Sequence, residues 1–188
     1  KYTAGYDVIA VVLSCDGQTS VIGSNIQILR LFDQSSNVPV WTFSATSKIY
    51  SISISAGGEY ITAGSHDSEI YLFDKDSSTP LWNHDTGETV YIVDISADGS
   101  YITAVDRGGK HVYLYDKESS TPLWLFTGDY PVHSVSISAD GEYIVAGYDG
   151  GSTSKVHLFG KDSNTPLWSY TAGGEVRTVA ISADGEYI

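Results

Sequence analysis

The sequence predicts an all-β protein built from four copies of one four-stranded antiparallel unit, with the start of a fifth copy. The first observation is an eleven-residue segment that ends in tryptophan and occurs four times, as LFDQSSNVPVW, LFDKDSSTPLW, LYDKESSTPLW and LFGKDSNTPLW. The second is its spacing, because the four tryptophans are 41, 42 and 44 residues apart. The third is a composition of 14 Tyr, 4 Trp, 5 Phe and no Met, which favours strands. A fixed period of this size is typical of propellers and other repeat architectures.

Each unit begins with a strand of the pattern apolar-x-x-apolar-x-apolar-Ser, which we name strand a. Its last three apolar positions alternate, as expected for a strand with one buried face. A tight Asp-Gly turn follows, or Gly-Gly in the second copy, and such turns need a residue with positive φ. Strand b comes after the turn. Strand a is predicted at 8–14, 49–55, 90–96, 132–138 and 176–182, and strand b at 19–23, 60–64, 101–105 and 143–147, with a last start at 187–188.

The second half of each unit is the tryptophan segment. Strand c is predicted at 29–32, 70–73, 112–115 and 156–159. A polar turn rich in Asp, Ser and Asn follows, and its side chains can bond nearby backbone. Proline then opens strand d, where its missing N–H is tolerated. The predicted repeats in this single region, 1–188, are about 2–44, 45–85, 86–127 and 128–170, with a partial repeat at 171–188.

A four-stranded unit of about 42 residues cannot bury both of its faces alone. Stacking the units face to face around an axis buries them and protects the sheet edges, which gives the blades of a β-propeller. Closed propellers of such repeats usually need about 250–340 residues for six to eight blades. We therefore expect a partial propeller, completed by the remainder of the same propeller or by further copies of the chain.

Two segments of the repeat resemble known propeller families. The stretch SADGEYIVAG at 138–147 resembles the a–b portion of a WD repeat, although Phe73-Asp74 stands where Trp-Asp is usual. The stretch from strand c to the tryptophan resembles the tryptophan-docking repeat of pyrroloquinoline-quinone-type propellers. The resemblance covers essentially the whole chain and implies the fold. It also leads us to expect a structural role between adjacent blades for Trp41, Trp82, Trp124 and Trp168.

Charge and cysteine content restrict the possible partners. The net charge is −13, which argues against nucleic acid and against anionic membranes. No apolar run is long enough for a membrane span, so no membrane insertion is expected. Cys15 replaces the alanine of the other repeats, so we expect a small buried side chain, and it cannot form an intramolecular disulfide. Acidity and abundant Ser, Thr and Tyr favour an extracellular or cell-surface location, with a cytoplasmic location as the alternative.

No catalytic, cofactor-binding or metal site is predicted, and the protein is expected not to be an enzyme. The five histidines fall in different repeats without ligand spacing. Asp33, Asp74 and Asp116 recur at one place and are expected to cap the c–d turns. The spacing of Asp74, Asp76 and Ser78 hints at calcium, but the run is shorter than an EF-hand loop and lacks its final Glu. The alternative is an oxidoreductase that depends on a quinone or a metal. The quinoprotein resemblance implies it, yet one cysteine cannot supply the adjacent-cysteine disulfide common in such enzymes.

The repeats differ mainly in the d–a and b–c loops, which lie at one end of a four-stranded meander. Variable loops on a rigid scaffold are common binding sites, although unconstrained drift would also produce variation. We therefore predict a scaffold that binds a protein or glycan through these loops. Aromatic and Arg residues, which are enriched at binding hot spots, guide the choice of residues. The candidates are Tyr50, Tyr91, His133 and Arg177 near the starts of strands a, with His66, Asp67, Asp106 and Arg107 in the b–c loops.

Overall fold

The computed structural model describes residues 3, 5–106, 108 and 110–188. They form four antiparallel sheets of four strands each, and in every sheet the strands are neighbours in chain order. This confirms the predicted all-β architecture of four-stranded blades. The blades are blade 1 with β1 (Val8–Leu13), β2 (Thr19–Ser24), β3 (Ile28–Asp33) and β4 (Trp41–Ser44), blade 2 with β5 (Ile49–Ile54), β6 (Tyr60–Ser65), β7 (Glu69–Asp74) and β8 (Trp82–Asp85), blade 3 with β9 (Val90–Ile95), β10 (Tyr101–Asp106), β11 (His111–Asp116) and β12 (Trp124–Thr127), and blade 4 with β13 (Val132–Ile137), β14 (Tyr143–Tyr148), β15 (Lys155–Gly160) and β16 (Trp168–Thr171).

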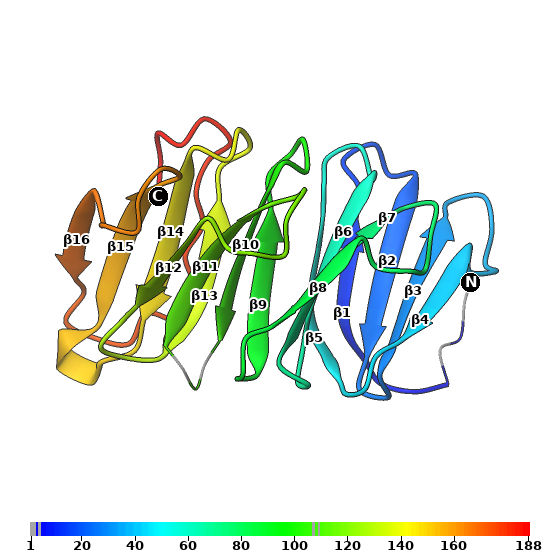
Figure 1. Cartoon of the computed structure of the whole chain (residues 1–188), viewed down its shortest axis with the longest axis horizontal. Coiled ribbons are helices and arrows are strands. Elements are labelled where there is room, and N and C mark those ends of the chain that lie inside the picture. Colours follow the sequence, from blue (N-terminus) through cyan, green and yellow to red (C-terminus); the bar gives the residue numbers. More distant parts are fainter. Residues whose placement is uncertain (1–2, 4, 107, 109) are drawn as a thin grey trace.

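The blades stand side by side in chain order, with blade 1 at one end of the row and blade 4 at the other (Figure 1). The first strands of consecutive blades, β1, β5, β9 and β13, are in contact. Backbone bonds also join the a–b turns along the row, since the Ala56 N–H donates to the Ala97 oxygen at 2.8 Å and the Ala97 N–H to the Ala139 oxygen at 2.9 Å. The repeats are therefore joined along one inner line by main-chain bonds that do not depend on side-chain identity.

The a–b turns have the conformation expected from their Asp-Gly and Gly-Gly pairs. The second residue of each pair is a glycine with positive φ, for example 77° at Gly99 and 75° at Gly141. In the third blade the Asp98 carboxylate accepts from the Ser96 hydroxyl at 2.7 Å and from the Ser100 N–H at 2.9 Å. The serine that ends strand a and the aspartate of the turn therefore act together, and the turn needs glycine at its next position.

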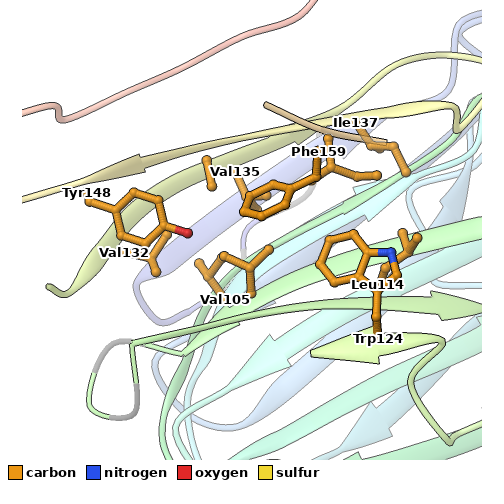
Figure 2. Close-up of a cluster of buried hydrophobic side chains, with 11 residues drawn as sticks. Val105, Leu114, Trp124, Val132, Val135, Ile137, Tyr148 and Phe159 are labelled. Atoms are coloured by element: carbon orange, nitrogen blue, oxygen red, sulfur yellow. The ribbon is translucent and has the colours of Figure 1, made fainter. Parts of the chain in front are cut away.

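Large apolar side chains fill the junctions between blades. Figure 2 shows the junction of blades 3 and 4, where Val105, Leu114 and Trp124 of blade 3 face Val135 and Phe159 of blade 4. At the junction of blades 2 and 3 the Val90 side chain packs so closely on the backbone of Gly64 that a Cβ on this glycine would meet it at 2.7 Å. Each blade therefore buries its faces only against its neighbours, as the stacking argument requires.

The residues after β16 continue the row without forming an assigned strand. The Ala139 N–H donates to the Ala183 oxygen at 3.0 Å, and the Val179 N–H donates to the Ser134 hydroxyl at 3.1 Å. A Cβ on Gly147 would meet the Val176 side chain at 2.6 Å, just as Gly64 lies against Val90. The segment 172–188 thus occupies the place of a next strand a and the start of strand b.

Cys15 does not have the buried position that we expected for it. Its side chain is exposed, because it belongs to the a–b turn of blade 1, and none of the described residues forms a further blade outside this one. Its N–H still donates to the Ala56 oxygen at 3.0 Å. The position that alanine occupies in the other repeats therefore predicted the backbone hydrogen bond of Cys15 correctly, but the predicted burial of its side chain was wrong.

None of the helices in the described part of the chain is long and apolar enough to cross a membrane.

Candidate partner-binding rim

The d–a and b–c loops gather at one end of the blades, as the antiparallel registers require. In blade 2 the start of β5 pairs with the end of β6, Ile49 with Ser65, and the start of β7 pairs with the end of β8, Glu69 with Asp85. We name this end the variable rim. The opposite end, formed by the a–b and c–d turns, is named the repetitive rim, because its sequence changes little from blade to blade.

Two predicted residues of the variable rim form an aromatic stack across the junction of blades 2 and 3. The rings of Tyr50 and Tyr91 lie 4.8 Å apart with an interplanar angle of 9°. The exposed His66 lies beside the stack, with its ring 5.8 Å from that of Tyr50. Burial and the neighbouring Tyr91 raise the pKa of Tyr50, so its phenol remains protonated at neutral pH. The structure thus brings three of the predicted residues into one half-exposed aromatic group.

The other predicted residues of this rim lie further along the row. His133 Nε2 is 3.7 Å from the Asp149 carboxylate, an ion pair when the imidazole is protonated. Arg177 has a largely exposed side chain and donates from Nε and Nη2 to the Glu175 carboxylate, at 2.9 and 2.8 Å. Arg107 lies outside the described residues. Further along the row from the tyrosine stack, His133 and Arg177 therefore each stand beside a carboxylate.

Asp67 and Asp106 are engaged inside the blades. Asp67 accepts from the Thr46 N–H and hydroxyl at 3.1 and 2.6 Å and from the Tyr71 hydroxyl at 3.1 Å. Although burial acts to raise the pKa of Asp67, these donors outweigh it and hold the pKa below its usual value. Asp106 has no exposed surface, and its carboxylate accepts from the Tyr113 hydroxyl at 2.9 Å. These carboxylates shape the loops, and Asp106 has no surface to offer a partner.

Asp94 in β9 is a charged residue on the inner strands that the sequence reasoning did not select. It accepts from the hydroxyls of Ser53 in blade 2 at 2.9 Å and Ser136 in blade 4 at 3.2 Å. The N–H of Ile137 also donates to it, at 3.1 Å. Burial raises the pKa of this carboxyl, while the donors partly counteract the effect. One residue therefore joins three blades, and the available signal was a single aspartate where the neighbouring repeats have serine.

The tryptophans recur at the outer edge of each junction. The indole N–H groups of Trp41, Trp82 and Trp124 each donate, at 2.7 Å, to a lysine carbonyl in the c–d turn of the next blade, and the three acceptors are Lys75, Lys117 and Lys161. The Trp41 ring also stacks on Phe73 of the next blade at 5.5 Å. Trp168 has no such turn beside it among the described residues and is 41% exposed. Three of the four tryptophans are thus docked between blades.

The described residues contain no group of three or more His, Cys, Asp or Glu side chains that could together hold a metal ion. The aspartates of the c–d turns bond the backbone of their own turns instead. Asp74, for instance, accepts from the Asp76 N–H at 2.9 Å, and Asp116 accepts from the Glu118 N–H at 2.9 Å. These contacts are those of turn caps.

Comparison with protein families places the chain. Residues 81–188, more than half of the sequence, match the model of DUF5711, a family of unknown function. The chain belongs to the DUF5711 family. Residues 37–74 of this DUF5711 chain match the WD domain, G-beta repeat, which spans the end of blade 1 and most of blade 2. No curated protein matches the sequence.

Solved structures show the same fold for this DUF5711 chain. The β-propeller domain of Cps50 (Swd1) from Myceliophteria thermophila matches with a TM-score of 0.84 and 14% sequence identity over 98% of the chain. The match covers 62% of that domain's chain, so the protein described here spans less than two thirds of its length. In all, 1741 chains of solved structures match, so the likeness establishes a WD-type β-propeller and does not identify an activity.

Proposed function

We propose that this DUF5711 chain is a non-enzymatic propeller scaffold that binds a protein or glycan partner through its variable rim. The observation that carries the proposal is the half-exposed stack of Tyr50 and Tyr91 with His66 beside it. The two rings come from different blades and are held parallel before any partner arrives. Aromatic groups fixed in this way provide contact area at little cost in conformational entropy, which is typical of binding hot spots.

The proposal is supported by the difference between the two rims. On the repetitive rim the same turn residues recur and bond one another, as the Asp98 and Asp140 turns do. On the variable rim, equivalent positions hold Tyr91, His133 and Arg177 in successive repeats. Because the blades share one backbone design, the exposed residues that differ at these positions are candidates for contact with a partner. An extracellular or cell-surface location remains part of the proposal.

Affinity capture with the immobilised full chain, together with a glycan array, tests the proposal. Tyr50→Ala combined with Tyr91→Ala should weaken the binding of any captured partner at least tenfold and leave the fold intact. Glu118→Ala is the matched control, because Glu118 is an exposed residue of the repetitive rim. If the tyrosine variant binds as tightly as the parent while changes in the turn 75–79 weaken binding, the proposed rim is the wrong one.

A further inference from the structure

The junction of blades 3 and 4 differs chemically from the two junctions before it. Tyr71, Tyr113 and His157 occupy one register position, opposite Ala63, Ala104 and Ala146 on strand b. In blades 2 and 3 the tyrosine hydroxyl is held by a carboxylate, that of Asp67 at 3.1 Å and that of Asp106 at 2.9 Å. Blade 4 has the shorter His157 instead. The residue that corresponds to Asp106, at the end of strand b, is Tyr148. The pairing of phenol with carboxylate therefore does not form in this junction.

A pocket of about 250 Å³ opens at this place. Phe126 of blade 3 and Tyr148 and His157 of blade 4 line it. The ring of Phe126 lies 5.5 Å from that of His157 at 63°, and the ring of Tyr148 lies 4.9 Å from it at 73°. The rings of Phe126 and Tyr148 also meet edge to face, with centroids 6.3 Å apart at 73°, so the three rings pack together as one aromatic wall of the pocket, against which another aromatic ring can lie. Small-molecule sites usually measure about 300–1,000 Å³, so this pocket suits a ligand with one ring.

His157 provides the polar group of the pocket. Its Nδ1 is 2.6 Å from the Ser169 hydroxyl, and no hydrogen bond joins its Nε2 to another residue in the part of the chain that the structure describes. Burial, with the nearby Lys155 in addition, lowers the pKa of His157, so the imidazole is neutral at pH 7. Neutral imidazole can donate or accept at Nε2, depending on its tautomer. The pocket therefore offers one hydrogen bond among aromatic walls.

The mouth of the pocket is polar without an excess of either charge. Lys155 and Asp129 both line it, and Lys155 Nζ is 3.4 Å from the Asp129 carboxylate. The b–c loop beside it contains the short 3₁₀ helix η1 (Gly151–Thr153), and the Thr153 hydroxyl donates to the Tyr130 hydroxyl at 2.9 Å. Because the two charged groups pair with each other, a neutral ligand is favoured over an ion.

We propose that this pocket binds a small neutral phenol, which hydrogen-bonds to His157 Nε2 and lays its ring against the aromatic wall of Phe126 and Tyr148. Such a ligand resembles the tyrosine side chain that the two preceding junctions supply from their own sequence. Figure 2 shows that the Tyr148 hydroxyl points into the apolar cluster. The Tyr148 ring thus serves as a wall, and the imidazole is the group that recognises the ligand.

Titration of the full chain with 4-methylphenol, followed by calorimetry and by protein NMR at pH 7.5, tests the proposal. Saturable binding is expected, with contacts between the ligand methyl group and the ring protons of Phe126 or Tyr148. His157→Tyr should weaken it at least tenfold, because this change supplies the phenol of the other junctions and fills the pocket. His84→Phe is the matched control: it also replaces a histidine by the aromatic residue of a neighbouring repeat, since Phe43 stands opposite Leu29 as His84 stands opposite Ile70.

Three outcomes overturn the proposal. The first is the absence of saturable binding to the wild-type chain up to the solubility limit of 4-methylphenol. The second is equal affinity of the wild-type and His157→Tyr chains. The third uses the wild-type protein alone and so does not depend on whether a variant folds: under saturating ligand, the methyl group shows no NMR contact with Phe126 or Tyr148. Since this pocket lies apart from Tyr50 and Tyr91, its failure leaves the proposed partner-binding rim unaffected.

Discussion

Trp124 and Trp168 stand at the same position of the repeat and have different surroundings. Trp124 is 9% exposed, donates its indole N–H to the Lys161 carbonyl and stands 5.4 Å from the Phe159 ring. Trp168 comes after the same Thr-Pro-Leu sequence and is 41% exposed, with no c–d turn beside it among the described residues. The comparison shows that the repeat sequence prepares a docking group, while the next blade determines whether it stabilises the fold.

Replacing these tryptophans by alanine should separate the two environments more than any other change. Trp124→Ala removes a buried ring and an interblade hydrogen bond, so we expect the free energy of unfolding to fall by about 3–5 kcal/mol. Trp168→Ala should cost about 1 kcal/mol or less, because much of that ring already meets solvent. Urea denaturation of both variants measures the difference. Equal losses would show that docking between blades is not what stabilises the tryptophan position.

The same comparison explains how far the sequence could predict the structure. The Asp-Gly turns and the Pro-Leu-Trp strands were predictable because backbone chemistry fixes them inside one repeat. The exposure of Cys15 depends on the packing at the outer face of blade 1, and that of Trp168 depends on the packing at the outer face of blade 4. Such contacts are absent from the repeat pattern, which is why the burial expected for Cys15 was wrong.

The predicted rim shows the same limit on a smaller scale. Tyr50 and Tyr91 are equivalent positions of adjacent repeats, so their neighbourhood followed from the stacking of blades. Asp67 and Asp106 were also selected because they vary. Each of them accepts a hydrogen bond from a tyrosine in strand c of its own blade: Tyr71 donates to Asp67, and Tyr113 donates to Asp106. Variation between repeats therefore indicates either a surface function or an exchanged internal contact, and sequence alone does not separate the two.

Replacing Asp106 and Asp67 by alanine tests whether a variable residue makes an internal contact. The expected loss in free energy of unfolding is smaller than that of Trp124→Ala. Asp106→Ala leaves the Tyr113 hydroxyl and the His111 N–H without the acceptor they use at 2.9 and 3.1 Å. A buried donor left unsatisfied costs about 1–3 kcal/mol, so we expect a loss of about 2–3 kcal/mol. Asp67→Ala should cost about 1 kcal/mol, since Asp67 is half-buried and water can replace it. Thermal unfolding of both variants checks the order, and a larger loss for Asp67→Ala would contradict it.

The smallest expected effect is on the pH dependence of the free energy of unfolding. Here the turn aspartates of the repetitive rim are compared with Asp94 of the inner strands. Hydrogen bonds from the serine hydroxyls of their turns hold the pKa values of Asp16, Asp140 and Asp184 below the usual 3.8. In each case the unfolded chain binds protons first as the pH falls, so these groups stabilise the fold above about pH 4 and lose that contribution below it. Asp94 acts in the opposite direction, because burial raises its pKa, and its contribution to stability decreases as the pH rises above 3.8.

Asparagine substitution separates these two contributions. Asp16→Asn combined with Asp140→Asn keeps an acceptor oxygen for the turn bonds and removes the titration. The free energy of unfolding of this variant, measured by urea denaturation between pH 3 and pH 7, should therefore fall less steeply on acidification than that of the parent. Asp94→Asn should instead make the fall steeper, because it removes the one carboxyl of this set that favours the fold in its protonated form. Parallel curves for all three proteins would show that neither the turn carboxylates nor Asp94 control the acid response.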